Sequence, residues 1–111
     1  MFKRRELVVC ADGFTMSVQA GETHYCSPRV ALGYEFENGV ACDRYNSVEV
    51  GFPSEVEPLF MQYCEDKDKP TETVYGWVPC SVVSLVIAKH GGMVSGEVPP
   101  GVAELRAKEL K

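Results

Sequence analysis

The stretch from residue 71 to residue 92 constrains the fold more than any other part of the sequence. Its first half, TETVYGWV, places threonine, tyrosine and tryptophan at every second position, which is typical of a β-strand over residues 71–78. Pro79 ends this strand because proline cannot donate to a sheet ladder. The apolar run at residues 82–88 and the glycine pair Gly91-Gly92 then predict a helix with a left-handed stop.

Little of the predicted helix is polar, so it must be covered on most of its sides. Two arrangements satisfy this requirement. The helix lies across a sheet of its own chain, or a second subunit buries it as well. In the second arrangement Val83 and Ile87 are interface residues of a homodimer, and Leu105 in the C-terminal segment is a third candidate. The sequence leaves both arrangements open.

Several segments outside this stretch have the period-two pattern of strands. They lie at residues 7–10, 14–20, 23–27 and 47–52, and the turn pair Asp12-Gly13 separates the first two. A further hairpin is predicted from Tyr34 to Cys42, because Asn38-Gly39 lies between two alternating arms. Two alternatives remain for this hairpin: it joins the main sheet, or it protrudes as a β-arm.

A first helix is expected before the strand at residues 71–78. The residues SEVE at 54–57 have the spacing of a capping box, but a helix that began at Glu55 would place Pro58 where its ring clashes. We therefore expect a tight turn at residues 54–57 and a helix that begins near Pro58. The predicted fold class is α+β: an antiparallel sheet of hairpins with two helices packed on one face.

Length and composition indicate a single domain. The chain has 111 residues, of which 45% are hydrophobic and 24% are charged, as in ordinary globular proteins. We assign residues 1–92 to the α+β domain and residues 93–111 to a C-terminal tail. Residues 102–110 of this tail have the pattern of a last short amphipathic helix.

Charge and cysteine content restrict the partners and the compartment. The net charge is −5, which disfavours nucleic-acid binding because phosphate neutralisation requires a surplus of Lys and Arg. No apolar run is long enough to span a bilayer, and the N-terminus leads into no signal-peptide core. Five cysteines without a secretory signal indicate reduced thiols. The sequence therefore predicts a cytoplasmic protein with no membrane partner.

Four residues form the candidate ligand-binding site. His24 and Cys26 lie two positions apart on a predicted strand, so both would point to one face, and Arg29 and Glu49 could add an arginine–carboxylate pair. A packed cysteine beside a strand histidine is the more common explanation of the first pair, and a structural loop anchor is the more common explanation of the second. Cys80 at a helix N-terminus is a further candidate thiolate. We predict no catalytic residue, metal site or cofactor.

Five short motifs together resemble small uncharacterised proteins of bacteriophage and prophage genomes. The motifs are Ser17-Val18-Gln19, His24-Tyr25-Cys26-Ser27-Pro28-Arg29, Val48-Glu49-Val50-Gly51-Phe52-Pro53-Ser54, Val74-Tyr75-Gly76-Trp77-Val78-Pro79 and His90-Gly91-Gly92. This resemblance implies an origin and no particular reaction. It favours a host-directed or phage-internal binding protein over a metabolic enzyme.

Two classes of function follow from these observations. The first is a non-catalytic protein-interaction module of phage type, whose partner is another protein or a second copy of the chain. The alternative is a small-ligand or metal-binding protein, or an enzyme, with a pocket near His24, Cys26, Arg29 and Glu49. A third class, an acidic mimic of nucleic acid, would need carboxylates spaced along one face.

Overall fold

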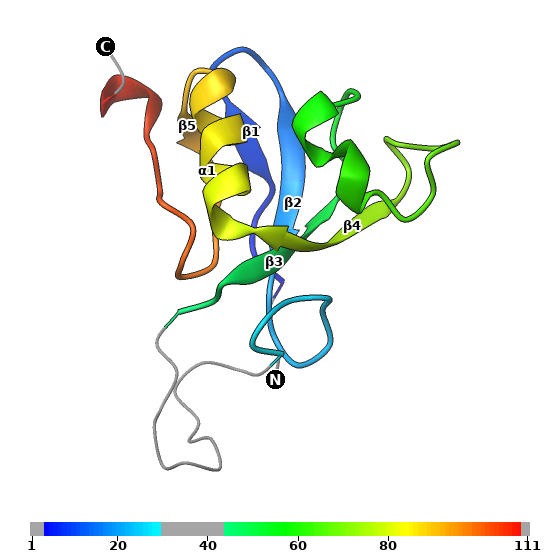
Figure 1. Cartoon of the computed structure of the whole chain (residues 1–111). Coiled ribbons are helices and arrows are strands. Elements are labelled where there is room, and N and C mark those ends of the chain that lie inside the picture. The colour runs from blue at the N-terminus through cyan, green and yellow to red at the C-terminus, as the bar shows by residue number, and fades with distance from the viewer. Residues whose placement is uncertain (1–3, 30–43, 110–111) are drawn as a thin grey trace, which may run out of the picture.

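The computed structural model describes residues 4–29 and 44–109 and shows an α+β fold. Its antiparallel sheet has the strand order β4-β3-β2-β1-β5 (Figure 1). The five strands are β1 (Val8–Cys10), β2 (Thr15–Gln19), β3 (Ser47–Gly51), β4 (Val74–Pro79) and β5 (Met93–Ser95). The predicted fold class is therefore confirmed. The predicted hairpin from Tyr34 to Cys42 lies outside the described residues.

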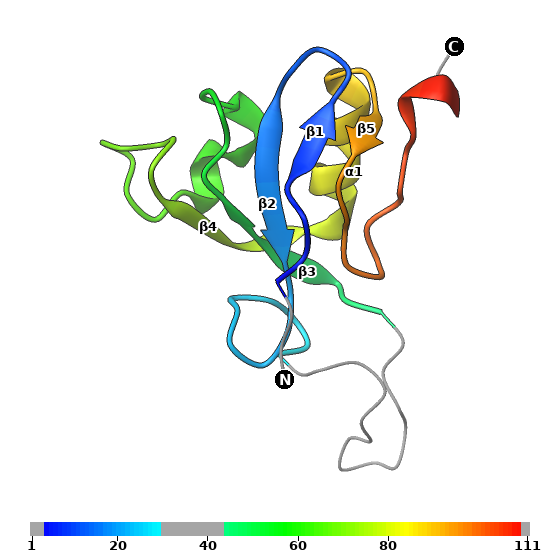
Figure 2. The same cartoon turned by 180° about the vertical axis from the view of Figure 1, so that it is seen from behind.

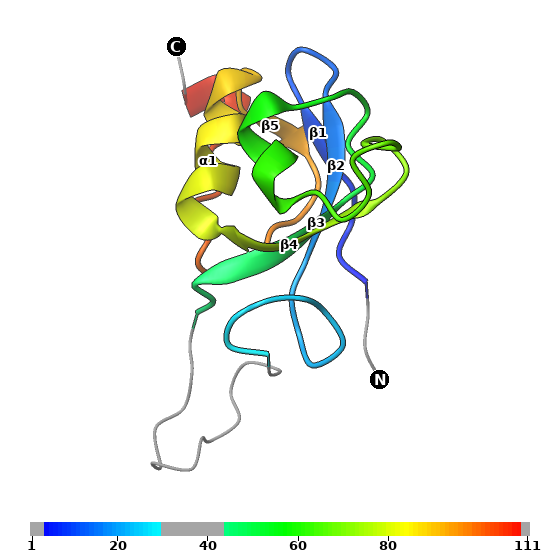
Figure 3. The ribbon, with the colours of Figure 1, turned by 45° about the vertical axis from the view of Figure 1, so that its right-hand side comes forward.

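Two helical elements flank β4 in the chain and pack on one face of the sheet. They are the 3-10 helix η1 (Pro58–Tyr63) and the α-helix α1 (Cys80–Lys89). Both lie in front of the sheet in Figure 1 and behind it in Figure 2, and Figure 3 shows them side by side. Within the described residues, no helix is long and apolar enough to cross a membrane.

The hairpin of β1 and β2 forms where the sequence predicts it. Val8 pairs with Met16, and the backbone N–H of Cys10 donates to the oxygen of Phe14 at 2.8 Å. In the turn between the strands, Gly13 has a φ of 96°, which a side chain would disfavour. The Asp12 carboxylate accepts the N–H of Phe14 at 2.9 Å, an Asx turn that fixes the position of the acid.

A change of register between β3 and β4 shapes the outer edge of the sheet. Val48 pairs with Val78 and Val50 pairs with Tyr75, so a single residue of β3, Glu49, lies opposite two residues of β4. One of those two residues, Trp77, has a φ of 50°, in the region that normally favours glycine. An extra residue of this kind, a β-bulge, changes the direction in which the side chain at that position points, here the indole of Trp77.

The core lies between the sheet and the two helices. Val83, Val86 and Ile87 of α1 are fully buried there, together with residues from every strand. The helix ends as predicted, because Gly91 and Gly92 have φ values of 92° and 88°. At its N-terminus, Pro79 precedes the first helical residue and no side-chain hydrogen bond caps the helix.

Two predicted elements are wrong. Residues 23–27 form turns with one isolated bridge from Ser27 to Ser47, because the Tyr25 N–H donates to the Glu49 side chain instead of a strand ladder. The described part of the predicted helix at residues 102–110 does not form an amphipathic helix. The chain is irregular up to the short 3-10 helix η2 (Ala107–Glu109), and the Met93 N–H donates to the Leu105 oxygen.

The segment after Gly92 packs onto the rest of the fold. β5 extends the sheet beside β1, and its first residue, Met93, is buried in the core. Val102 is also buried, and Leu105 packs against the core with part of its surface exposed. This strand was not predicted, because its three residues and the proline pair at 99–100 give no periodic signal.

Candidate functional site

Three of the predicted site residues, His24, Cys26 and Arg29, lie on the segment after β2, and the fourth, Glu49, lies on β3. The Glu49 side chain holds the segment around residues 24 and 25. His24 Nδ1 lies 3.0 Å from one Glu49 oxygen, and the Tyr25 N–H donates to the other oxygen at 3.0 Å. Both carboxylate oxygens are therefore occupied within the chain. His24 and Glu49 come together as a pair, and the pairing anchors the backbone of Tyr25.

Cys26 and Arg29 make separate contacts. The buried Cys26 thiol donates to the Gly21 carbonyl at 3.3 Å, and burial raises the pKa of this thiol. A neutral, buried thiol is a poor nucleophile. Arg29 instead places its guanidinium 5.5 Å from the centre of the Tyr25 ring. The other candidate thiol, Cys80, is buried and donates to the Tyr45 oxygen, and burial raises its pKa too.

The predicted interface residues lie mostly inside the chain. Val83 and Ile87 are fully buried against the sheet, and Leu105 packs partly against the core. The large apolar residue that α1 does present to solvent is Leu85, which is 56% exposed. Any contact through α1 would thus use a different residue from those that the sequence indicated.

An exposed aromatic pair, which sequence reasoning missed, lies beside the His24–Glu49 anchor. The rings of Tyr25 and Trp77 are stacked, with centres 5.0 Å apart and planes 23° from parallel. We call this pair the aromatic platform. The Trp77 N–H donates to the Tyr25 oxygen at 2.9 Å, so backbone and side chains hold the two residues together. Trp77 nevertheless remains 51% exposed.

The aromatic platform forms one wall of a surface pocket of about 450 Å³. Gly76 lines the pocket, and a Cβ atom at this position would lie 3.2 Å from the Tyr25 Cβ, so a larger residue here would require the Tyr25 side chain to shift by a few tenths of an ångström. The rest of the lining comes from the end of η1 and the two residues after it, which are Gln62, Tyr63, Cys64 and Glu65. The pocket thus combines three aromatic side chains with one carboxylate.

A second cluster joins three distant segments through His90, directly after α1. Its Nδ1 lies 2.6 Å from Asp12 in the β1–β2 turn, and its Nε2 lies 2.8 Å from Glu57 before η1. Glu57 is only 1% exposed and also accepts the Leu59 N–H and the Lys89 ammonium, each at 2.9 Å. His90 stacks on Phe14, with ring centres 4.1 Å apart. We call these hydrogen-bonded side chains the His90 cluster.

Charges in the His90 cluster stabilise one another. Burial works to lower the pKa of His90, but its hydrogen bonds to the Asp12 and Glu57 carboxylates raise the pKa overall. Burial likewise works to raise the pKa of Glu57, and the Leu59 N–H, Lys89 and His90 together lower it overall. A histidine with both nitrogens donating is an imidazolium, so it has no free lone pair for general-base catalysis.

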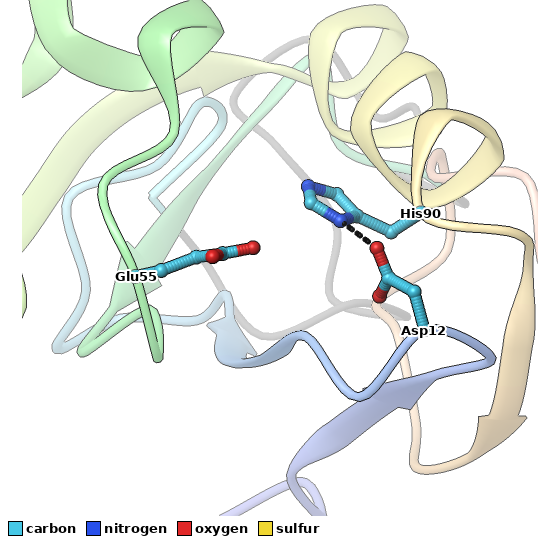
Figure 4. A group of neighbouring side chains, drawn as sticks. All are labelled: Asp12, Glu55 and His90. Carbon is cyan, nitrogen blue, oxygen red and sulfur yellow. Dashed lines mark hydrogen bonds and ion pairs between the residues drawn. The ribbon is translucent and has the colours of Figure 1, made fainter.

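Asp12 and His90 of this cluster, together with the neighbouring Glu55, have the donor types of a divalent-cation site. One ligand atom each from Asp12, Glu55 and His90 lies within 4.8 Å of the others, and Glu55 points toward the other two (Figure 4). However, the His90 nitrogens already bond to Asp12 and Glu57. A cation would have to displace a proton and the Asp12 bond. The geometry therefore favours an ion-pair cluster that ties the β1–β2 turn to α1 and η1.

Stability is expected to fall as the pH rises through the raised pKa of His90. The contribution of His90 is complete below its ordinary pKa of 6.5 and is lost above its folded value. Glu57, whose pKa is lowered, contributes above its ordinary value of 4.5, and that contribution is lost as the pH falls through its folded value. Urea unfolding at a series of pH values should give a maximum between these limits.

The variant His90→Gln is the control for this pH dependence. Glutamine retains hydrogen-bonding groups but does not titrate, so the decline on the alkaline side should flatten. An equal decline in the variant would contradict the assignment to His90.

Comparison with protein-family models, curated proteins and solved structures found no match to this chain. The resemblance to small phage and prophage proteins therefore stays a prediction. A proposal for the function therefore has to start from the side chains of the aromatic platform and of the His90 cluster.

Proposed function

We propose that this chain is a non-catalytic interaction module that binds a protein partner through the aromatic platform and its pocket. The observation that supports this most is Trp77. It is a large aromatic residue whose side chain is half exposed. Its backbone adopts a φ of 50°, in the left-handed region. Such a conformation costs on the order of 1–3 kcal/mol for a residue other than glycine, and strain of this kind clusters at functional positions.

The composition of the surface fits this role. Tyrosine and tryptophan dominate the energetically important centres of protein interfaces, because they bury a large area and lose little conformational entropy. Here the Glu49 carboxylate and the backbone N–H of Trp77 hold Tyr25 in place before any partner arrives. A surface that is already ordered loses less entropy on binding than a flexible loop does.

The alternative, a small-ligand site or an enzyme around His24, Cys26, Arg29 and Glu49, has weaker support. The pocket beside this segment is lined by Tyr25 and by none of these four residues. Their polar groups are largely satisfied by one another or by the backbone. A homodimer through α1 would have to use its exposed face around Leu85, because Val83 and Ile87 are buried in the core.

We further propose that the protein works in the cytoplasm, because its free thiols fit a reducing compartment. The cysteines that the structure describes, Cys10, Cys26, Cys64 and Cys80, are all free. A phage-type role remains a proposal that rests on the sequence resemblance.

Selection of peptides from a random display library on the immobilised full chain tests the proposed function. Because Trp77 is the only tryptophan in the sequence, its fluorescence reports binding at the platform directly. We expect enriched peptides to change the Trp77 emission in solution. Enriched peptides that bind without changing this emission would place the binding surface elsewhere and contradict the proposal.

A further inference from the structure

The pocket beside the aromatic platform has the chemistry of a cation-binding site. Its three aromatic residues, Tyr25, Tyr63 and Trp77, present ring faces or edges to one cavity of about 450 Å³. The face of an aromatic ring carries partial negative charge and attracts a cation within about 6 Å of the ring centre. Trp77 is the strongest such ring, and its stacking on Tyr25 covers only one of its two faces.

Charge around the pocket points to the same class of ligand. Glu65 lines the pocket, is exposed and forms no ion pair within the part of the chain that the structure describes. The loop that it begins, residues 65–72, contains four acidic residues and two lysines. No arginine or lysine lines the pocket. An anionic ligand would therefore meet an unpaired carboxylate and no positive side chain in the lining of the pocket.

Arg29 shows which cation suits these rings. Its guanidinium lies 5.5 Å from the centre of the Tyr25 ring, so the chain itself places an arginine on the aromatic platform. Planar guanidinium groups stack on aromatic rings and are more weakly hydrated than an ammonium group. Arg29 also brings one positive charge near the pocket. The loop at residues 65–72, which includes Glu65, carries four negative charges against two positive ones.

We propose that the pocket binds the guanidinium group of an arginine side chain from the partner protein, between the Trp77 ring and the Glu65 carboxylate. This inference rests on the proposed interaction function and adds the chemical class that the partner must present. The alkyl part of the arginine would contact the aromatic rings, while its planar head would pair with Glu65. The net charge of −5 favours the approach of such a basic segment.

A matched pair of small probes tests the inference on the full chain. The probes are acetyl-arginine amide and acetyl-citrulline amide, which have similar shapes but differ in charge. We expect the arginine probe to bind about 3- to 30-fold more tightly, as followed by Trp77 fluorescence. We expect Glu65→Gln to weaken arginine binding about two- to five-fold. Glu72→Gln, a change at an exposed acid in the same loop that does not line the pocket, should have a smaller effect.

The outcomes separate this inference from the proposed function. Equal binding of the two probes, no binding of the arginine probe, or no effect of Glu65→Gln would overturn the cation site. If display-selected peptides still changed the Trp77 emission in that case, the interaction surface would stand and its ligand would be uncharged, as a proline-rich segment is. If those peptides left Trp77 unaffected, the proposed function itself would fail.

Discussion

Replacing Glu57 with alanine is expected to lower the free energy of unfolding by about 3–5 kcal/mol. The Glu57 side chain is 1% exposed and accepts hydrogen bonds from the Leu59 N–H, Lys89 and His90. Removing it leaves the buried His90 nitrogen without its carboxylate and the first turn of η1 without its cap. Breaking one partner of a buried ion pair is costly because the remaining charge is uncompensated.

Glu55→Ala is the matched control for this change. Glu55 lies two residues earlier, is exposed and has the same side chain. Its removal should change the free energy of unfolding by no more than about 0.5 kcal/mol. Urea unfolding of both variants, followed by circular dichroism, measures the difference. Equal destabilisation by the two changes would contradict the role assigned to the His90 cluster.

Replacing Trp77 with alanine is expected to weaken binding of a display-selected peptide by about 30- to 1,000-fold. The residue forms the exposed half of the aromatic platform, and truncation at the centre of an interface typically costs about 2–4 kcal/mol. Stability should fall by at most about 1.5 kcal/mol, the worth of one aromatic stack. Fluorescence anisotropy of a labelled peptide measures the affinity without using the tryptophan.

Leu85→Ala provides the control for binding. Leu85 is an exposed apolar residue on α1, with an exposed fraction of 56% against 51% for Trp77. Peptide affinity should be unchanged in this variant. A loss of affinity in Leu85→Ala, with wild-type affinity in Trp77→Ala, would move the binding surface to α1.

Local sequence signals predicted much of the fold. The Asp12-Gly13 turn and the alternation of residues 14–20 correctly indicated the first hairpin, and Gly91-Gly92 correctly ended the helix. These signals act between near neighbours in the chain. The three-residue strand β5 was missed because its stability comes from pairing with β1 and not from its own pattern.

The two candidate sites were harder to predict, for a physical reason. The sequence paired Glu49 with Arg29 and His24 with Cys26, whereas the structure pairs Glu49 with His24 because residues 23–27 form turns and not a strand. The His90 cluster was not predicted, because Asp12, Glu57 and His90 come from three separate segments. The aromatic platform depends on the register shift opposite Glu49, which changes the direction of Trp77 and which no residue pattern specifies.

The most direct test of the interaction surface is chemical-shift mapping by NMR of the full chain with a display-selected peptide. If the aromatic platform is the binding site, the indole N–H of Trp77 and the backbone amides of Tyr25, Tyr63 and Glu65 will shift most. Shifts centred on Leu85 or Val94, exposed apolar residues away from this pocket, with an unchanged Trp77 indole signal, would contradict the account.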